Sequence, residues 1–168
     1  MSAPRNILVV AHTGRTDSLE AAVTVCQQLL AAGAVPVLAR NERAELLASC
    51  PDLDDQVAIL HESVATTELE LVIVLGGDGT ILRAAEIVRG CSAPLLGINL
   101  GHVGFLAESE RDDLGEAVRR ALLRDYLVEE RMTLSVRVKL ADEVIYETWA
   151  LNEATVEKSS RERWTACA

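Results

Sequence analysis

The stretch Leu71-Val-Ile-Val-Leu75 runs directly into Gly76-Gly-Asp-Gly-Thr80, and this junction decides the fold that we expect. A short apolar run of β-forming residues is typical of a strand buried on both faces. The glycines break the strand and a helical pattern follows, which brings backbone N–H groups to a helix N-terminus, where phosphate binds favourably. Asp78 would repel phosphate, so its carboxylate needs another role: holding a metal ion, orienting a hydroxyl group or accepting a proton.

Strand and helix patterns alternate along the first three quarters of the chain. Asn6-Ile-Leu-Val-Val-Ala11 indicates a buried first strand, and Asp17 or Ser18 is suited to cap the helix that follows. The expected strands are 6–11, 35–39, 71–75 and 94–98, and the expected helices are about 17–33, 41–49, 57–61, 80–89 and 112–124. This order predicts an α/β fold in which helices flank a parallel sheet.

The hydrophobic period changes near residue 132, from helical spacing to strict alternation. Met132 to Leu140 alternates apolar and polar residues, which indicates a strand with one buried face, and residues 144–156 read as its antiparallel partner. We therefore expect an α/β domain at 1–125, followed at 126–168 by the start of a β-rich second domain. A lone hairpin is marginally stable in water, and this one would expose Leu134, Val136 and Val138.

Composition limits the classes of partner. The chain has 168 residues, 49% of them hydrophobic, and a formal net charge of −10, which argues against binding to nucleic acid or to an anionic membrane. It has no basic-then-apolar leader and no apolar run of membrane-spanning length. The four cysteines lack metal-site spacing, so we expect reduced thiols in a cytoplasmic protein.

A candidate site follows from the ends of two strands. In an open parallel sheet, ligands bind beyond the carboxyl ends of the strands. If strands 71–75 and 94–98 are neighbours, the glycine-rich loops after them face one cleft. Each loop taken alone also fits a plain strand–helix connection. The residues expected to bind phosphate or ATP there are Gly76, Gly77, Gly79, Thr80, Asn99 and Gly101.

For three further polar residues, the sequence leaves open whether the side chain binds a ligand or has only a structural role. Arg83 lies one helical turn after Thr80 and can reach back toward a phosphate or toward Asp78, or it can be a solvated arginine on the helix face. Asn152 and Glu153 interrupt an apolar strand, and they fit a ligand site or a simple strand end equally well.

Three motifs carry a resemblance to a known family. They are Gly76-Gly-Asp-Gly-Thr80, Gly97-Ile-Asn-Leu-Gly-His-Val-Gly-Phe-Leu106 and Leu151-Asn-Glu153. In this order and spacing they resemble the signatures of bacterial NAD kinases of the actinobacterial type, from about residue 5 to about residue 163. The first motif alone is shared with diacylglycerol, sphingosine and 6-phosphofructo-kinases, and the other two are more specific.

The resemblance implies phosphorylation of the adenosine-ribose 2′-hydroxyl of NAD by ATP, with a divalent cation such as Mg²⁺ and usually in a homo-oligomer. It implies Asp78 as proton acceptor, with NAD bound by Asp78, Gly79, Arg83, Asn152, Glu153 and Arg163. No residue is assigned as a metal ligand. Because phosphoryl transfer has a loose transition state, early deprotonation gains little, so we expect Asp78 to orient the hydroxyl and to take its proton late.

The chain also departs from the family pattern. Family members continue into a β-rich domain with a second Gly-Asp-Gly turn and a Pro-Thr-Gly-Ser-Thr loop, neither of which occurs here. We therefore expect an N-terminal fragment of an NAD kinase with little or no activity alone. The alternatives are a lipid or sugar kinase that shares the first motif, and a non-catalytic nucleotide-binding module.

Overall fold

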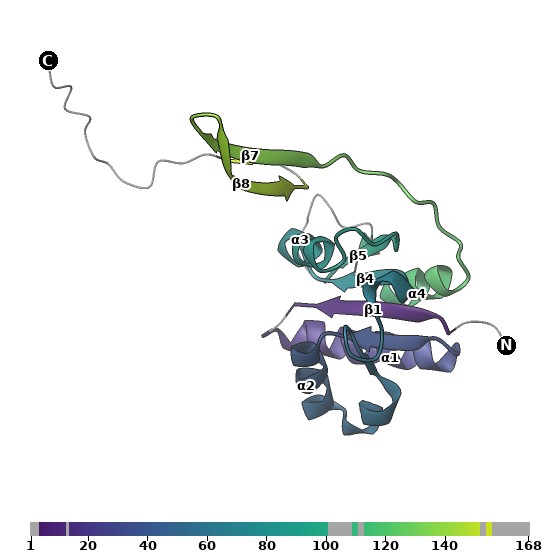
Figure 1. The fold of residues 1–168 in the computed structure, drawn as a ribbon. Coiled ribbons are helices and arrows are strands. Elements are labelled where there is room, and N and C mark those ends of the chain that lie inside the picture. Colours follow the sequence, from purple (N-terminus) through teal and green to yellow (C-terminus); the bar gives the residue numbers. More distant parts are fainter. Residues whose placement is uncertain (1–3, 13, 101–108, 111–112, 152–153, 156–168) are drawn as a thin grey trace, which may run out of the picture. The chain divides into compact units, whose positions relative to one another are not determined.

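The computed structural model describes residues 4–12, 14–100, 109–110, 113–151 and 154–155 (Figure 1). The chain divides into two compact units, Met1–Val128 and Glu129–Ala168, and each is described by itself. Among the described residues, no helix is long and apolar enough to cross a membrane.

The first unit is a parallel sheet with the strand order β3-β2-β1-β4-β5-β6. Its strands are β1 (Asn6–Ala11), β2 (Val35–Leu38), β3 (Ala58–Ile59), β4 (Leu69–Leu75), β5 (Leu95–Asn99) and β6 (Ser109–Glu110). Its α-helices are α1 (Thr16–Ala31), α2 (Arg40–Ser49), α3 (Asp78–Ile87) and α4 (Leu114–Leu122). Every strand pairing is parallel, which confirms the predicted fold class.

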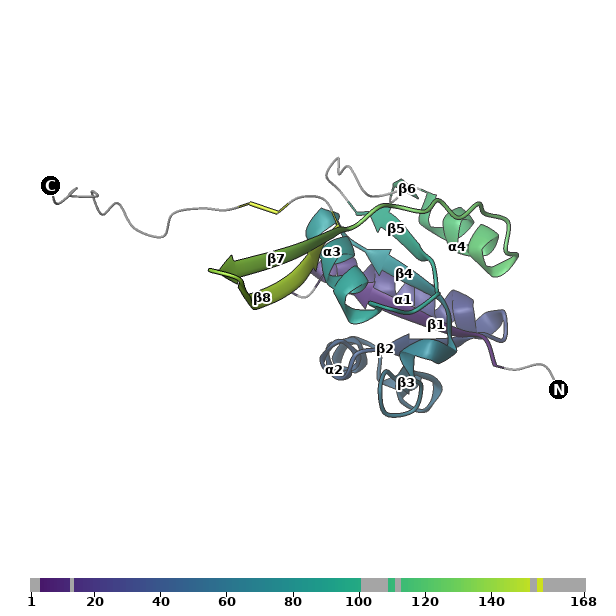
Figure 2. The ribbon, with the colours of Figure 1, turned by 45° about the horizontal axis from the view of Figure 1, so that its top comes forward.

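Alternate residues of the central strands bury their side chains on opposite faces of the sheet. Ile7 and Val9 of β1 join a core cluster with α1 and α4, whereas Leu8 and Val10 join a second cluster with α3. Helices therefore cover both faces (Figure 2). Each fully buried aliphatic side chain contributes about 1.5–3 kcal/mol, so β1, whose Ile7, Leu8, Val9 and Val10 are all 0% exposed, contributes strongly to the stability of this unit. Cys26 of α1 is 0% exposed, and burial raises the pKa of its thiol to about 12.

Two local predictions were wrong. The expected helix at 57–61 is instead a 3-10 helix, Pro51–Gln56, followed by β3. Arg43 fixes this segment, since its guanidinium donates to the Asp54 carbonyl at 2.6 Å and to the Val57 carbonyl at 3.3 Å. Helix α1 starts earlier than expected, with Arg15 as N-cap and no side-chain cap from Asp17 or Ser18.

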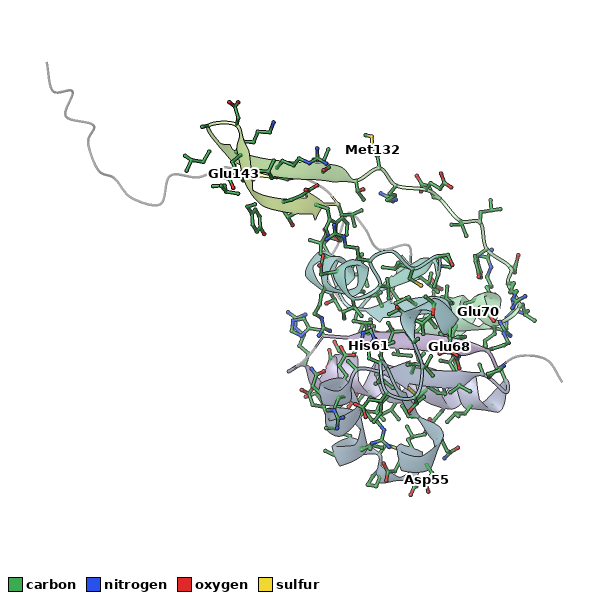
Figure 3. All side chains as sticks on the ribbon, viewed as in Figure 1. Asp55, His61, Glu68, Glu70, Met132 and Glu143 are labelled. Carbon is green, nitrogen blue, oxygen red and sulfur yellow. The ribbon has the colours of Figure 1, made fainter. Side chains whose placement is uncertain are left out.

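An ion cluster joins β4 to the segments before β1 and after α4. The carboxylate of Glu70, which is labelled in Figure 3, accepts hydrogen bonds from Arg5 Nε at 2.9 Å and from Arg124 Nη2 at 2.9 Å. Arg5 also donates to the Leu122 carbonyl at 2.9 Å, at the end of α4. The two guanidinium groups lower the pKa of Glu70 to about 2. The cluster lies at the amino-terminal end of β4, opposite the end that carries the glycine loop.

The second unit contains one antiparallel hairpin, β7 (Leu134–Leu140) with β8 (Glu143–Ala150). This confirms the predicted hairpin, although β7 starts two residues later than expected and β8 ends at Ala150. Within the unit, Leu134 is 42% exposed and Val138 is 45% exposed, as expected, whereas Val136 is half-buried.

Candidate functional site

The turn from β4 into α3 depends on the absence of a side chain at Gly76. This residue has φ of +153°, and its N–H donates to the Ile98 carbonyl of β5 at 3.0 Å. A Cβ atom at Gly76 would lie 2.5 Å from Thr80 Oγ1, and Thr80 itself is only 5% exposed. The buried hydroxyl of Thr80 therefore packs directly beneath the turn and fixes its path.

Helix α3 starts at Asp78, and its N-terminus has no capping side chain. Gly77 is the N-cap, and no side-chain hydrogen bond is made there. The N–H groups of an uncapped first turn need acceptors from elsewhere, and together with the helix dipole they favour an anion. Asp78 lies in this first turn. The loop thus presents backbone donors and one carboxylate at the same point.

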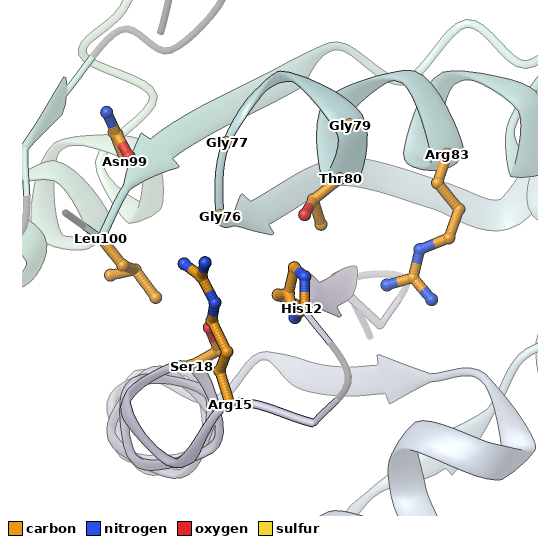
Figure 4. A pocket seen from close by; sticks show the side chains of 10 residues that line it. All are labelled: His12, Arg15, Ser18, Gly76, Gly77, Gly79, Thr80, Arg83, Asn99 and Leu100. Carbon is orange, nitrogen blue, oxygen red and sulfur yellow. The ribbon is translucent and has the colours of Figure 1, made fainter. Parts of the chain in front are cut away.

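The two strands that precede the predicted loops are neighbours, since Val72–Leu75 of β4 pairs with Leu95–Ile98 of β5. A cavity of about 490 Å³ lies at the carboxyl ends of the strands (Figure 4). The residues that line it are His12, Arg15, Ser18, Gly76, Gly77, Gly79, Thr80, Arg83, Asn99 and Leu100. Five of the predicted phosphate-binding residues are therefore brought together, and the sixth, Gly101, lies outside the described residues.

The β1–α1 connection supplies the wall of the cavity that sequence reasoning missed. His12, Arg15 and Ser18 come from this connection and from the first turn of α1. The strand order is the feature that would have indicated this wall. β1 lies between β2 and β4, so the connections after β1 and after β4 leave the sheet on opposite faces. A crevice opens between the two connections. A second cavity of about 340 Å³, near α2, also borders His12 and Arg15.

Arg83 lines the first cavity, but its guanidinium is held by a partner that the sequence did not suggest. Its Nη2 donates to the Ala11 carbonyl at 2.5 Å and to Glu42 Oε1 at 2.7 Å. Glu42 is 4% exposed, and burial raises the pKa of its carboxyl group against the opposing effect of Arg83. Of the alternatives that the sequence left open for Arg83, neither a contact with Asp78 nor a fully solvated guanidinium is found, because the guanidinium forms an ion pair between α3 and α2.

The remaining predicted residues divide into two groups. Asp78 is placed at the start of α3, but it is not among the residues that line the cavity. Asn152, Glu153 and Arg163 lie outside the described residues. Within the described part of the chain, no group of three or more His, Cys, Asp or Glu side chains is arranged to hold a metal ion.

The family profile and the similar proteins found by sequence comparison all point to the same family. The NAD kinase family profile, described as the ATP-NAD kinase N-terminal domain, matches residues 7–126. The NAD kinase of Leifsonia xyli subsp. xyli is 72% identical over 163 residues, which cover 97% of this chain and 53% of that protein. The NAD kinase of Corynebacterium efficiens is 48% identical over 158 residues, which cover 94% of this chain and 50% of that protein.

A solved structure has the same fold. The crystal structure of yeast NADH kinase complexed with NADH superposes with a TM-score of 0.70 at 17% sequence identity. The match covers 89% of this chain and 47% of that one. The chain spans about half the length of the curated relatives it matches. The family profile accounts for more than half of the chain and contains the first two sequence motifs, and the chain therefore belongs to the NAD kinase family.

Proposed function

We propose that this chain supplies the N-terminal part of a site that transfers a phosphoryl group from ATP to the 2′-hydroxyl of the adenosine ribose of NAD. The observation that carries the proposal is the Gly76–Thr80 turn. It joins an uncapped helix N-terminus to a cavity at the crevice between β1 and β4. A cytoplasmic location and a homo-oligomeric enzyme belong to the same proposal, by resemblance to the family.

The backbone of the turn binds phosphate oxygens. The N–H groups at the start of α3 and the adjacent glycines let a phosphate approach the backbone closely, and a Cβ atom at Gly76 would displace Thr80 and so the turn itself. Donors fixed in this way stabilise charge that develops during transfer without having to reorganise. Gly76, Gly77, Gly79, Thr80, Asn99 and Gly101 form this phosphate region in the proposal.

Asp78 acts on the acceptor. The 2′-oxygen forms a new bond to the γ-phosphorus while the bond from that phosphorus to the β–γ bridging oxygen breaks, and ADP leaves. The hydroxyl proton passes to the Asp78 carboxylate late in the transfer and then to solvent. Arg83, Gly79, Asn152, Glu153 and Arg163 are the proposed partners of NAD. Asp78 is thus a catalytic residue that orients the hydroxyl before it accepts a proton.

Mg²⁺ fits this arrangement as a companion of the phosphates. The ion is commonly held by one or two carboxylates together with substrate phosphates, and not by a dedicated protein cage. The turn offers such a carboxylate in Asp78, beside the region proposed for phosphate. When bound, the ion neutralises phosphate charge, and the residues of the chain position the two substrates.

The test is a chimera, because the chain matches about half of its relatives. Residues 1–163, which include every proposed site residue, are joined to the part of the Leifsonia xyli NAD kinase that lies beyond the matched region, and NADP formation from NAD and ATP is followed in a coupled assay. We expect NADP formation by the chimera and little or none by the 168-residue chain alone. A folded chimera that binds NAD and ATP but forms no NADP would contradict the proposal. That result would favour the alternative, a nucleotide-binding module without catalytic activity.

A further inference from the structure

We propose that Arg15 and Ser18 form a second wall of the phosphate site, opposite the Gly76–Thr80 turn, and bind oxygens of a nucleotide di- or triphosphate. This inference rests on the proposed function and extends it to residues outside the three family motifs. It follows from three properties of the described residues: an arginine without an ion pair, a cavity-lining hydroxyl without a hydrogen bond to a described residue, and their common position on one cavity.

Arg15 is the exception among the arginines that the structure describes. Each of the others forms an ion pair or another recorded interaction, namely Arg5, Arg40, Arg43, Arg83, Arg89, Arg119, Arg120, Arg124, Arg131 and Arg137. Arg15 has no ion pair or side-chain hydrogen bond with any described residue, although the chain carries a net charge of −10. An unpaired guanidinium in so acidic a protein is available for an anionic ligand.

Ser18 is a second polar group without a protein partner. It is 2% exposed, it lines the cavity, and its hydroxyl forms no hydrogen bond with a described residue. Among the described residues, the fully buried side-chain atoms without a hydrogen-bond partner are Gln28 Oε1 and Glu42 Oε2, so the Ser18 hydroxyl is not one of them and can be reached from the cavity. The side of the hydroxyl that is open to the cavity is where a ligand oxygen would bind.

The position of this wall follows from the sheet. β1 and β4 are adjacent, and the His12 N–H donates to the Leu75 carbonyl at 3.1 Å, which fixes the start of the β1–α1 connection beside the glycine turn. Figure 4 shows the Arg15 side chain extending from the start of α1 toward Gly76. The volume of about 490 Å³ between the walls lies in the range of small-molecule sites.

The chemistry of the two walls is complementary. Backbone N–H groups of the turn bind single phosphate oxygens, whereas the planar guanidinium of arginine can donate two parallel hydrogen bonds to one phosphate. A ligand with two or more linked phosphates can therefore contact both walls at once. ATP and NAD both carry such a group, and inorganic triphosphate carries it without a nucleoside.

The test measures binding of ATP, NAD and inorganic triphosphate to the 168-residue chain by titration calorimetry. The variants are Arg15→Gln, Ser18→Ala and, as a control of equal charge change, Arg119→Gln, whose exposed ion pair lies outside both cavities. We expect Arg15→Gln to weaken triphosphate binding at least about tenfold and Ser18→Ala to weaken it about two- to tenfold. Arg119→Gln leaves the affinity unchanged, and circular dichroism checks that each variant is folded.

The ligands separate the two sources of phosphate. Weakened binding of ATP and triphosphate alone assigns the wall to the phosphoryl donor, and weakened binding of NAD as well assigns it to a diphosphate common to both. Equal affinities of Arg15→Gln and Arg119→Gln for all three ligands overturn the inference, as does a wild-type chain that binds none of them at millimolar concentration. Neither result bears on NADP formation by the chimera, which decides the proposed function independently.

Discussion

A Cβ atom on Gly76 would lie 2.5 Å from the hydroxyl oxygen of Thr80, a separation that real Cβ atoms do not reach. Since Gly76 also has φ of +153°, alanine there is strained in its backbone as well as in its contact. We expect Gly76→Ala to lower the free energy of unfolding by about 2–4 kcal/mol, measured by urea denaturation.

The control for that variant is the adjacent glycine. A Cβ atom on Gly77 would meet no atom within 4 Å, and its φ is −87°. Gly77→Ala is therefore expected to change the free energy of unfolding by less than about 1 kcal/mol. Equal destabilisation by the two substitutions would show that the Gly76–Thr80 contact does not determine the path of the turn.

Removal of the Glu42 carboxylate tests the ion pair with Arg83. Glu42→Ala leaves the guanidinium with the Ala11 carbonyl alone, and we expect it to cost about 1–3 kcal/mol, since the Arg83 side chain is 38% exposed and water compensates in part. Glu42→Gln keeps an oxygen acceptor, so its cost is smaller at neutral pH. Chemical denaturation of both variants measures the difference.

The same position predicts a pH effect of definite sign. Burial raises the pKa of Glu42, so the folded state binds its proton more tightly than the unfolded state does. This contribution to stability is complete below the unfolded pKa of 4.5 and is lost as pH rises through the folded value. The stability of the wild-type chain relative to Glu42→Gln is therefore expected to fall as pH rises above 4.5, and a constant difference would contradict the effect.

The contribution of Glu70 to stability changes with pH in the opposite direction to that of Glu42. Arg5 and Arg124 lower its pKa from 4.5 to about 2, so its contribution is present above pH 4.5 and is lost as pH falls toward 2. We expect the wild-type chain to lose about 1–3 kcal/mol more over this interval than Glu70→Gln does. Glu62→Gln, which removes the exposed pair with Arg40, is the control and keeps the wild-type profile.

Asp78→Asn tests the catalytic role in the chimera described above. The amide keeps the size of the side chain but cannot accept the proton, and we expect turnover to fall by about 10²–10⁴ while substrate binding is largely kept. Initial rates at saturating NAD and ATP give the effect on turnover, and calorimetry gives the affinities. Near-normal turnover would remove Asp78 from the mechanism.

Most of the sheet was predictable because its signals are local. β1 and β4 are uninterrupted apolar runs, and the glycines after β4 mark the turn without reference to the rest of the chain. β3 and β6 were not predicted, since each has two residues and exists only by pairing with a neighbouring strand. Short edge strands carry too few residues for an alternation to be visible.

Only the side of the site formed by the Gly76–Thr80 turn could be predicted from the sequence. The Gly76–Thr80 turn has a motif, and the pairing of β4 with β5 confirms that the strands before the two loops are neighbours. The contribution of Arg15 depends on β1 lying next to β4, a non-local fact that the sequence pattern does not contain. Likewise, Glu42 lies on a weakly amphipathic helix, and only the folded arrangement places its carboxylate beside Arg83.

The alkylation rate of the buried Cys26 thiol measures how often helix α1 opens away from the sheet. Alkylating reagents attack the thiolate, and a side chain that is 0% exposed with a pKa of about 12 reacts only when α1 lifts from the sheet. The partly exposed Cys50 and Cys91 provide a less protected reference in the same molecule. Ser18 lies in the first turn of α1, so a phosphate ligand that contacts both walls would stabilise the packed position of this helix. The alkylation rate of Cys26 would therefore fall as the phosphate site fills.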